Sequence, residues 1–260
     1  MSFNLNQMRA RVIVAPSFHT SFGPFRMLEA VPWLMLASSM RFVAYGMPGI
    51  LALIALFIAN VALCLALLVA AQRMIELSNG TIDIDRLSFR ERSKLALAVV
   101  IRVIGLSIVA AVAAFLVKFG PFAVQMIGGF DGIAFDQPTK MGMVWSSFLA
   151  CLVLVMVVCA RRDGGKPSLR GALLELLQRA VWLVPAIVVT ALLQIGLSSV
   201  QGVVRVTILQ LYFDPSIPPS MWQRLGYFGF VFGFATLRLW VTLAVLIFAL
   251  RESYRRSVRA

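Results

Sequence analysis

The sequence predicts an all-α integral membrane protein whose six transmembrane helices form three hairpins with cytoplasmic interfacial lead-in helices. Three observations predict this fold class. Apolar residues make up 60% of the 260-residue chain and charged residues only 13%, whereas an ordinary soluble domain carries about 25% charged residues. Several apolar runs are long enough to cross a bilayer, and most basic residues gather in every second segment between them.

A helix needs about 20 mostly apolar residues to cross the hydrocarbon core of a membrane. Five runs meet this requirement, namely residues 50–71, 95–117, 141–160, 180–204 and 225–250. Three of them carry no charge, and the other two carry one arginine each, Arg102 and Arg238. A shorter run at residues 28–45 begins close to Glu29 and includes Arg41, so it either spans the membrane or lies in its interface.

The charges of the connecting segments decide between these two possibilities, because cytoplasmic loops are enriched in Lys and Arg. Four segments hold 17 basic residues in total, namely residues 1–27, 72–94, 161–179 and 251–260. The alternate loops hold four, and they are residues 46–49, 118–140 and 205–224. Both termini lie on the basic, cytoplasmic side only if residues 28–45 span. We therefore predict six spans, with five spans and an interfacial first helix as the alternative.

This topology divides the chain into a cytoplasmic N-terminal segment (1–27), a single transmembrane domain (28–250) and a basic cytoplasmic tail (251–260). The third hairpin has the clearest lead-in helix, because apolar residues recur on one helical face from Leu169 after Pro167. Before the second hairpin, residues 88–91 (Ser-Phe-Arg-Glu) fit a capping box, which starts a helix. Pro16-Ser17 marks the place of the first lead-in.

The segment Lys166-Pro167-Ser168-Leu169-Arg170, which leads through Leu173 and Arg179 into an apolar helix, resembles a bacterial family. This family comprises multi-helix membrane proteins related to the membrane region of glycerophosphodiester phosphodiesterases. In that family the phosphodiesterase chemistry belongs to a separate soluble domain, which these 260 residues do not contain. The resemblance implies a role in the bacterial envelope or with lipids.

The sequence lacks the residues that haem, metal, disulfide and nucleotide-phosphate sites require. His19 is the single histidine, so paired haem ligands and a histidine metal cluster are not available. The three cysteines, Cys64, Cys151 and Cys159, lie inside apolar runs and have no spacing typical of a disulfide framework or a thiolate metal site. No phosphate-loop motif is present. We predict no catalytic residues, no metal and no cofactor.

The net charge of +13 does not point to nucleic acid, because the basic residues sit in short segments between apolar runs rather than on one soluble face. We therefore expect no nucleic-acid partner. The expected partners are membrane lipids, anionic lipids included, and a protein of a membrane complex.

Polar residues recur along one face of the fifth helix. They are Thr190, Gln194, Ser198, Gln201 and Arg205, and Arg238 lies near the middle of the sixth helix. A polar stripe is costly against lipid, so it should face protein or a water-filled recess. One interpretation is that these side chains hydrogen-bond between helices and hold the bundle together. The other is an outward-opening pocket, in which Arg205 and Arg238 hold an anion such as a lipid phosphate beside neutral donors from Gln194, Ser198 and Gln201.

The sixth helix also contains the motif Gly229-x-x-x-Gly233, with Gly226 one turn earlier. Small residues at this spacing allow two helices to approach closely. We expect the three glycines to pack helices within the chain, with a dimer contact as the alternative.

Three functions are compatible with the sequence. The favoured one is a non-enzymatic protein of the bacterial inner membrane that binds a lipid or another amphipathic anion, or serves as the membrane subunit of an envelope complex. A small secondary transporter or channel-like protein is the second, supported by the three hairpins and the polar stripe. A membrane enzyme acting on lipids is the third. Its candidate acids are Asp131 and Asp136 in an outer loop and Asp83 and Asp85 in an inner one, whose spacing matches no catalytic pattern.

Overall fold

The computed structural model describes residues 18–20, 24–77, 88–127, 129–162, 166–213 and 220–257. Within these residues, six helical stretches are long and apolar enough to cross a membrane. They are Met27–Gly46, Ile50–Ala71, Phe89–Leu116, Lys140–Ala160, Ala180–Tyr212 and Met221–Arg255. The chain is thus a multi-pass, all-α membrane protein, and the predicted fold class is confirmed. Because residues 27–46 form one stretch of spanning length, six spans fit the structure better than five.

The helices follow in the order α1 (Val31–Gly46), α2 (Ile50–Met74), α3 (Phe89–Leu116), α4 (Gly120–Ile127), α5 (Lys140–Arg162), α6 (Leu169–Gln178), α7 (Ala180–Tyr212) and α8 (Met221–Ser257). Two 3-10 helices, η2 (Pro24–Ala30) and η3 (Asp131–Ile133), precede α1 and α5. Strands β1 (Phe18–Thr20) and β2 (Ile75–Leu77) pair antiparallel, with Phe18 opposite Leu77. The sequence did not predict α4 or the strand pair. Helices α3, α7 and α8 are longer than predicted, because their polar ends continue the helix beyond the apolar runs.

The predicted lead-in helices are realised in different ways. The third is a separate helix, α6, and its first turn is capped by Ser168, whose Oγ accepts a hydrogen bond of 3.2 Å from the Gly171 amide. The second is the beginning of α3 itself, where Ser88 and Glu91 form the expected capping box. Pro16-Ser17 lies outside the described residues, and η2 leads directly into α1.

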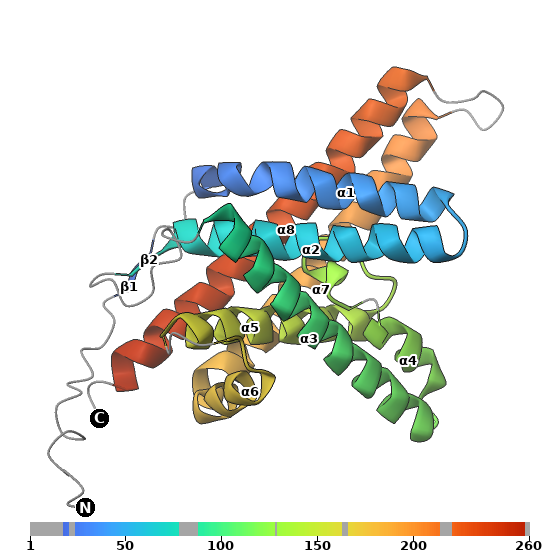
Figure 1. The fold of residues 1–260 in the computed structure, drawn as a ribbon. Helices are drawn as coiled ribbons and strands as arrows, with labels where there is room; N and C mark the ends of the chain where they lie inside the picture. The colour runs from blue at the N-terminus through green and yellow to red at the C-terminus, as the bar shows by residue number, and fades with distance from the viewer. Residues whose placement is uncertain are drawn as a thin grey trace, which may run out of the picture.

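The helices form three hairpins, α1–α2, α3–α5 and α7–α8 (Figure 1). Gly49 allows the tight turn between α1 and α2, because its φ of +66° lies in the left-handed region that side chains disfavour. The α7–α8 hairpin crosses the others at an angle, and the end of α7 and the beginning of α8 project beyond the other helices (Figure 1). The C-terminal end of α8 lies at the same end of the molecule as the last turns of α2 and α5 (Figure 1).

Helix α5 is the central element of the core. Every residue from Leu149 to Val158 is at most 2% exposed, and helices α3, α4, α6, α7 and α8 all contact α5. The second half of α2, from Ala62 to Ala71, is similarly buried. In contrast, α3 and α7 present apolar side chains such as Val109 and Val188, which are more than half exposed and suited to contact lipid.

A polar cluster joins the α6–α7 junction to the end of α8. Arg179 donates from Nε to Glu175 at 2.7 Å and from Nη1 to the Ser253 carbonyl at 3.2 Å. The Tyr254 hydroxyl also donates to Glu175, at 2.9 Å, and the Arg179 guanidinium lies 3.6 Å from the centre of the Tyr254 ring. This cluster satisfies a buried carboxylate and fixes α6 against the bundle.

The structure corrects the expectation for Gly226, Gly229 and Gly233. A Cβ atom built on any of them would meet no atom within 4 Å, so they do not pack helices within the described part of the chain. Aromatic rings on the same part of α8 make the contacts instead. Phe228 lies 5.6 Å from Phe42 of α1, between ring centres, and such large rings hold the backbones apart.

Candidate functional site

Arg238 is the centre of a buried polar network between α7 and α8. Its side chain is only 1% exposed. Nη1 donates to Gln194 Oε1 at 2.9 Å, and Nη2 donates to Gln201 Oε1 and to Asp136 Oδ1, both at 3.0 Å. A buried arginine is tolerated in a membrane only with such partners, because an unpaired charge away from water is costly.

Other members of the stripe complete this network. The Gln194 amide donates to the Thr242 hydroxyl at 2.7 Å, and Ser198 donates to Asp136 Oδ1 at 2.5 Å. Thr190 is buried, and its hydroxyl has no hydrogen-bond partner among the described residues. The stripe therefore joins α7 to α8 and to the loop after η3, as the first of the two sequence interpretations expected.

The loop after η3 delivers the carboxylate that pairs with Arg238. It folds back into the bundle because Ile133, Ala134 and Phe135 are at most 5% exposed and act as an apolar anchor. Gly132 of η3 comes just before this loop. It lies so close to α5 and to the loop that a Cβ atom would collide with Ser146 and with Gln137. The absence of a side chain at Gly132 thus lets the loop reach a depth at which Asp136 meets Arg238.

A second ion pair lies beside the first. Arg41 of α1 pairs with Asp131, whose other carboxylate oxygen accepts from Gln137 at 2.8 Å. The Arg41 guanidinium also lies 4.7 Å from the centre of the Phe135 ring and donates to the Tyr45 hydroxyl at 3.1 Å. Burial raises the pKa of the Asp131 carboxyl, and the charge of Arg41 and hydrogen bonds from Gln137 and Arg41 counteract part of this rise.

Between these two ion pairs lies a cavity of about 520 Å³, which we call the polar pocket. It is lined by the last turns of α1, the loop after η3, and the facing parts of α7 and α8. The residues are Ser38, Arg41, Phe42, Tyr45, Ala134, Phe135, Asp136, Gln137, Pro138, Gln201, Gly202, Arg205, Tyr227 and Val231. It lies toward the end of the bundle opposite the C-terminal end of α8, because it is formed by the end of α7 and the beginning of α8.

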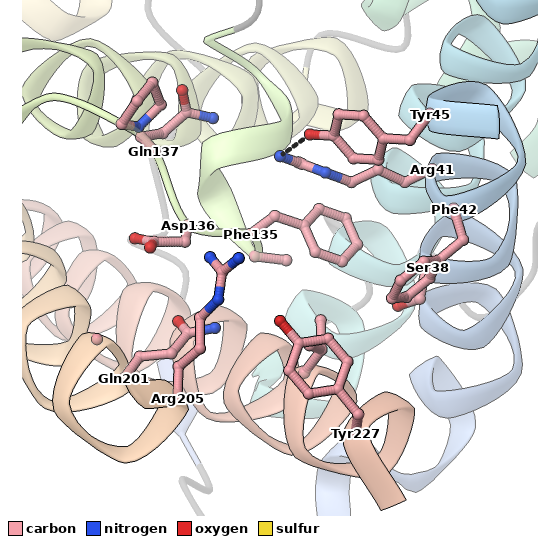
Figure 2. A pocket seen from close by; sticks show the side chains of 14 residues that line it. Ser38, Arg41, Phe42, Tyr45, Phe135, Asp136, Gln137, Gln201, Arg205 and Tyr227 are labelled. Atoms are coloured by element: carbon pink, nitrogen blue, oxygen red, sulfur yellow. Dashed lines mark hydrogen bonds between the residues drawn. The ribbon is translucent and has the colours of Figure 1, made fainter. Parts of the chain in front are cut away.

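Arg205 is the charged side chain of the polar pocket that is not committed to an ion pair within the described residues. It is exposed, and its guanidinium points toward the loop residues Phe135 and Asp136 (Figure 2). Gln201 lies beside it, and the Tyr227 hydroxyl is directed into the same space (Figure 2). Asp136 is engaged by Arg238, whereas Arg205 has no carboxylate within ion-pair distance in this part of the chain.

Arg205 also borders a second cavity, of about 610 Å³, which we call the apolar groove. Its other lining residues are Phe42, Leu209, Phe213, Met221, Arg224, Leu225, Tyr227 and Phe228. Several of these apolar side chains are exposed, including Leu209, Met221 and Leu225. One cation thus stands at the boundary between a polar and an apolar compartment, an arrangement suited to an amphipathic anion.

No family model, curated protein or solved structure matches the chain.

The structure separates residues that the sequence grouped as one anion site. Most of these residues do come together, but their polar groups bind one another and Asp136 rather than a ligand. They are Gln194, Ser198, Gln201 and Arg238. Arg238 is therefore buried and already paired with Asp136. Only Gln201 and Arg205 of that set line the polar pocket.

Arg41, Asp136 and Tyr227 were missed as parts of one site. A signal for Asp136 did exist, because an arginine within a span requires an acidic or polar partner and the outer loop carries two aspartates. Which of the two aspartates folds back cannot be read from their spacing. The candidate catalytic acids of the outer loop, Asp131 and Asp136, are each held by an arginine. Asp83 and Asp85 lie outside the described residues.

Proposed function

We propose that this protein is a non-enzymatic component of the bacterial inner membrane that binds an amphipathic anion, such as a lipid, at Arg205. The observation that carries the proposal is the position of Arg205. It is an exposed cation without an ion pair among the described residues, and it lines both the polar pocket and the apolar groove. An anionic group bound to Arg205 places its polar part in the pocket and its apolar part in the groove. Arginine suits this role because its fork of donors matches a phosphate or carboxylate.

The contacts between the polar pocket and the opposite end of the bundle favour binding over transport. The polar stripe of α7 is closed by hydrogen bonds to Arg238, Asp136 and Thr242 rather than left open as a passage. Toward the other end of the bundle, the buried apolar residues of α2, α5 and α8 fill the space between helices. A protein that binds an anion without moving it also fits the role of a membrane subunit in an envelope complex.

A resemblance in the sequence supports a lipid-related role rather than an enzymatic one. The segment from Lys166 to Arg179 resembles membrane proteins related to glycerophosphodiester phosphodiesterases, whose chemistry resides in a separate domain.

The proposal includes an orientation in which both termini lie in the cytoplasm and the polar pocket opens to the outer face. It is supported by the 17 basic residues of the alternate segments against four on the other side. Alkaline phosphatase fused after Lys118 is expected to be active in bacteria, and the same enzyme fused after Ala260 inactive, because it folds only outside the cytoplasm. The reverse pattern of activities would overturn the orientation.

The test of the binding function is the substitution Arg205→Gln. This change removes the cation that has no ion pair among the described residues, so the affinity for a single-chain anion such as dodecyl phosphate should fall about tenfold or more, the equivalent of one charge-assisted hydrogen bond. Native mass spectrometry of the protein in a neutral detergent counts the bound amphiphile at each concentration.

Lys140→Gln is the matched control. It removes a basic side chain at the beginning of α5, near the same end of the bundle, without touching either cavity. Dodecyl phosphate should bind this variant as it binds the wild type. Equal affinities for the wild type and the Arg205→Gln variant would refute the proposed function.

A further inference from the structure

Among the described residues, the charges around the polar pocket sum to one positive charge without an ion-pair partner. Three charged residues line it, namely Arg41, Asp136 and Arg205. Arg41 is neutralised by Asp131, and Asp136 is neutralised by Arg238 at 3.0 Å. Arg205 is the remaining charge, since no carboxylate of the described residues lies within ion-pair distance of it. A bound group with one negative charge would therefore balance the pocket.

The neutral groups of the pocket select the rest of the headgroup. Asp136 uses Oδ1 for Arg238 and Ser198, whereas its Oδ2 makes no hydrogen bond to the described residues, and the side chain is 40% exposed. The Tyr227 hydroxyl points into the same space (Figure 2). Hydroxyl groups of a ligand would donate to Asp136 and exchange hydrogen bonds with Tyr227. An ammonium group would find no net negative charge there, because Arg238 already balances Asp136.

From this balance we infer that the ligand is a glycerophospholipid with a monoanionic phosphodiester and a neutral, hydroxylated headgroup. The phosphodiester binds Arg205, the headgroup hydroxyls lie in the polar pocket near Asp136 and Tyr227, and an acyl chain occupies the apolar groove along Leu209 and Leu225. This inference rests on the proposed function, and it adds the class of lipid and the basis for its selection.

Competition between two lipids with identical acyl chains tests this inference. Phosphatidylglycerol has the inferred headgroup, and phosphatidylethanolamine replaces the hydroxyls by an ammonium. When both are added in equal amounts to the delipidated protein in neutral detergent, native mass spectrometry should find phosphatidylglycerol bound with about tenfold preference, which corresponds to one charge-assisted contact. Arg205→Gln should weaken the binding of both lipids and reduce this preference, because it removes the excess positive charge that disfavours the ammonium, whereas the hydroxyl contacts to Asp136 and Tyr227 remain. Lys140→Gln should keep the full preference.

A second variant tests the headgroup contacts separately. Tyr227→Phe keeps the ring contacts with Phe213 and Phe230 and removes only the hydroxyl. This substitution should lower the affinity for phosphatidylglycerol about two- to fivefold, an effect typical of the loss of one neutral hydrogen bond. Binding of dodecyl phosphate, which has no hydroxylated headgroup, should not change.

The possible outcomes separate the inference from the function on which it rests. In one outcome, the two phospholipids bind with equal affinity while Arg205→Gln lowers the affinity for each. This result would support the anion site at Arg205 and overturn the inferred class of lipid. A preference for phosphatidic acid, which carries more than one charge, over phosphatidylglycerol would overturn it as well. If Arg205→Gln left every amphiphile bound as in the wild type, the proposed function would fail too.

Discussion

Replacement of Arg238 by methionine is expected to destabilise the folded protein by about 3 kcal/mol, the lower end of the cost of breaking a buried ion pair. The lower end applies because Asp136 is 40% exposed and can be hydrated once its partner is gone. Gln194 and Gln201 are only 2% and 8% exposed, and their side-chain amides would each lose a charged partner in the core. Equilibrium unfolding by a denaturing detergent, followed by the fluorescence of the five tryptophans, measures the change.

Two companion variants identify the source of this loss. Arg238→Lys keeps the charge but not the planar fork that reaches Gln194, Gln201 and Asp136 together, so we expect an intermediate loss of stability. The double variant Arg238→Met with Asp136→Ala should lose less than the sum of the two single changes, because both changes remove the same ion pair. Strict additivity would show that the two residues do not interact in the folded protein.

Gly132→Ala is expected to lower the free energy of unfolding by about 1–3 kcal/mol, the usual penalty for adding a carbon to a well-packed interior. The new Cβ atom would lie 2.6 Å from Cγ of Gln137 and would also collide with Ser146 of α5. Neither neighbour can move freely, because both are held by hydrogen bonds. The Ser146 hydroxyl donates to the Gly142 carbonyl at 2.7 Å, and the Gln137 amide donates to Asp131 at 2.8 Å. The loop must therefore shift and take Asp136 with it. The same unfolding measurement reports stability, and titration with dodecyl phosphate reports the effect on the pocket.

Gly196→Ala is the matched control for this prediction. Gly196 lies inside α7, and a Cβ atom there would meet nothing within 4 Å. This substitution should leave stability unchanged or raise it, because alanine favours a helix by about 1 kcal/mol over glycine. If Gly132→Ala were as stable as Gly196→Ala, close packing under the loop would have no energetic role.

The polar network shows how far the sequence could predict the candidate site. The spacing of Gln194, Ser198 and Gln201 correctly indicated one polar face on α7, and the cost of exposing such a face to lipid indicated that it is covered. The partner of Arg238 was not predictable in the same way. Asp136 lies 102 positions before Arg238 in the chain, and only the folding of the loop after η3 brings them together.

The sequence by itself determined the membrane class, the six spans, the capping box of α3 and the apolar face of α6, because these depend on local composition and on interactions between residues close in the chain. The tertiary structure decided that Arg238 is paired, that Arg205 is not paired within the described residues, and that Gly226, Gly229 and Gly233 do not pack against another helix of the described chain. The physical reason is that a charge is neutralised, and a helix face covered, by whichever side chain the fold places within a few ångströms, and sequence spacing does not specify distances between helices.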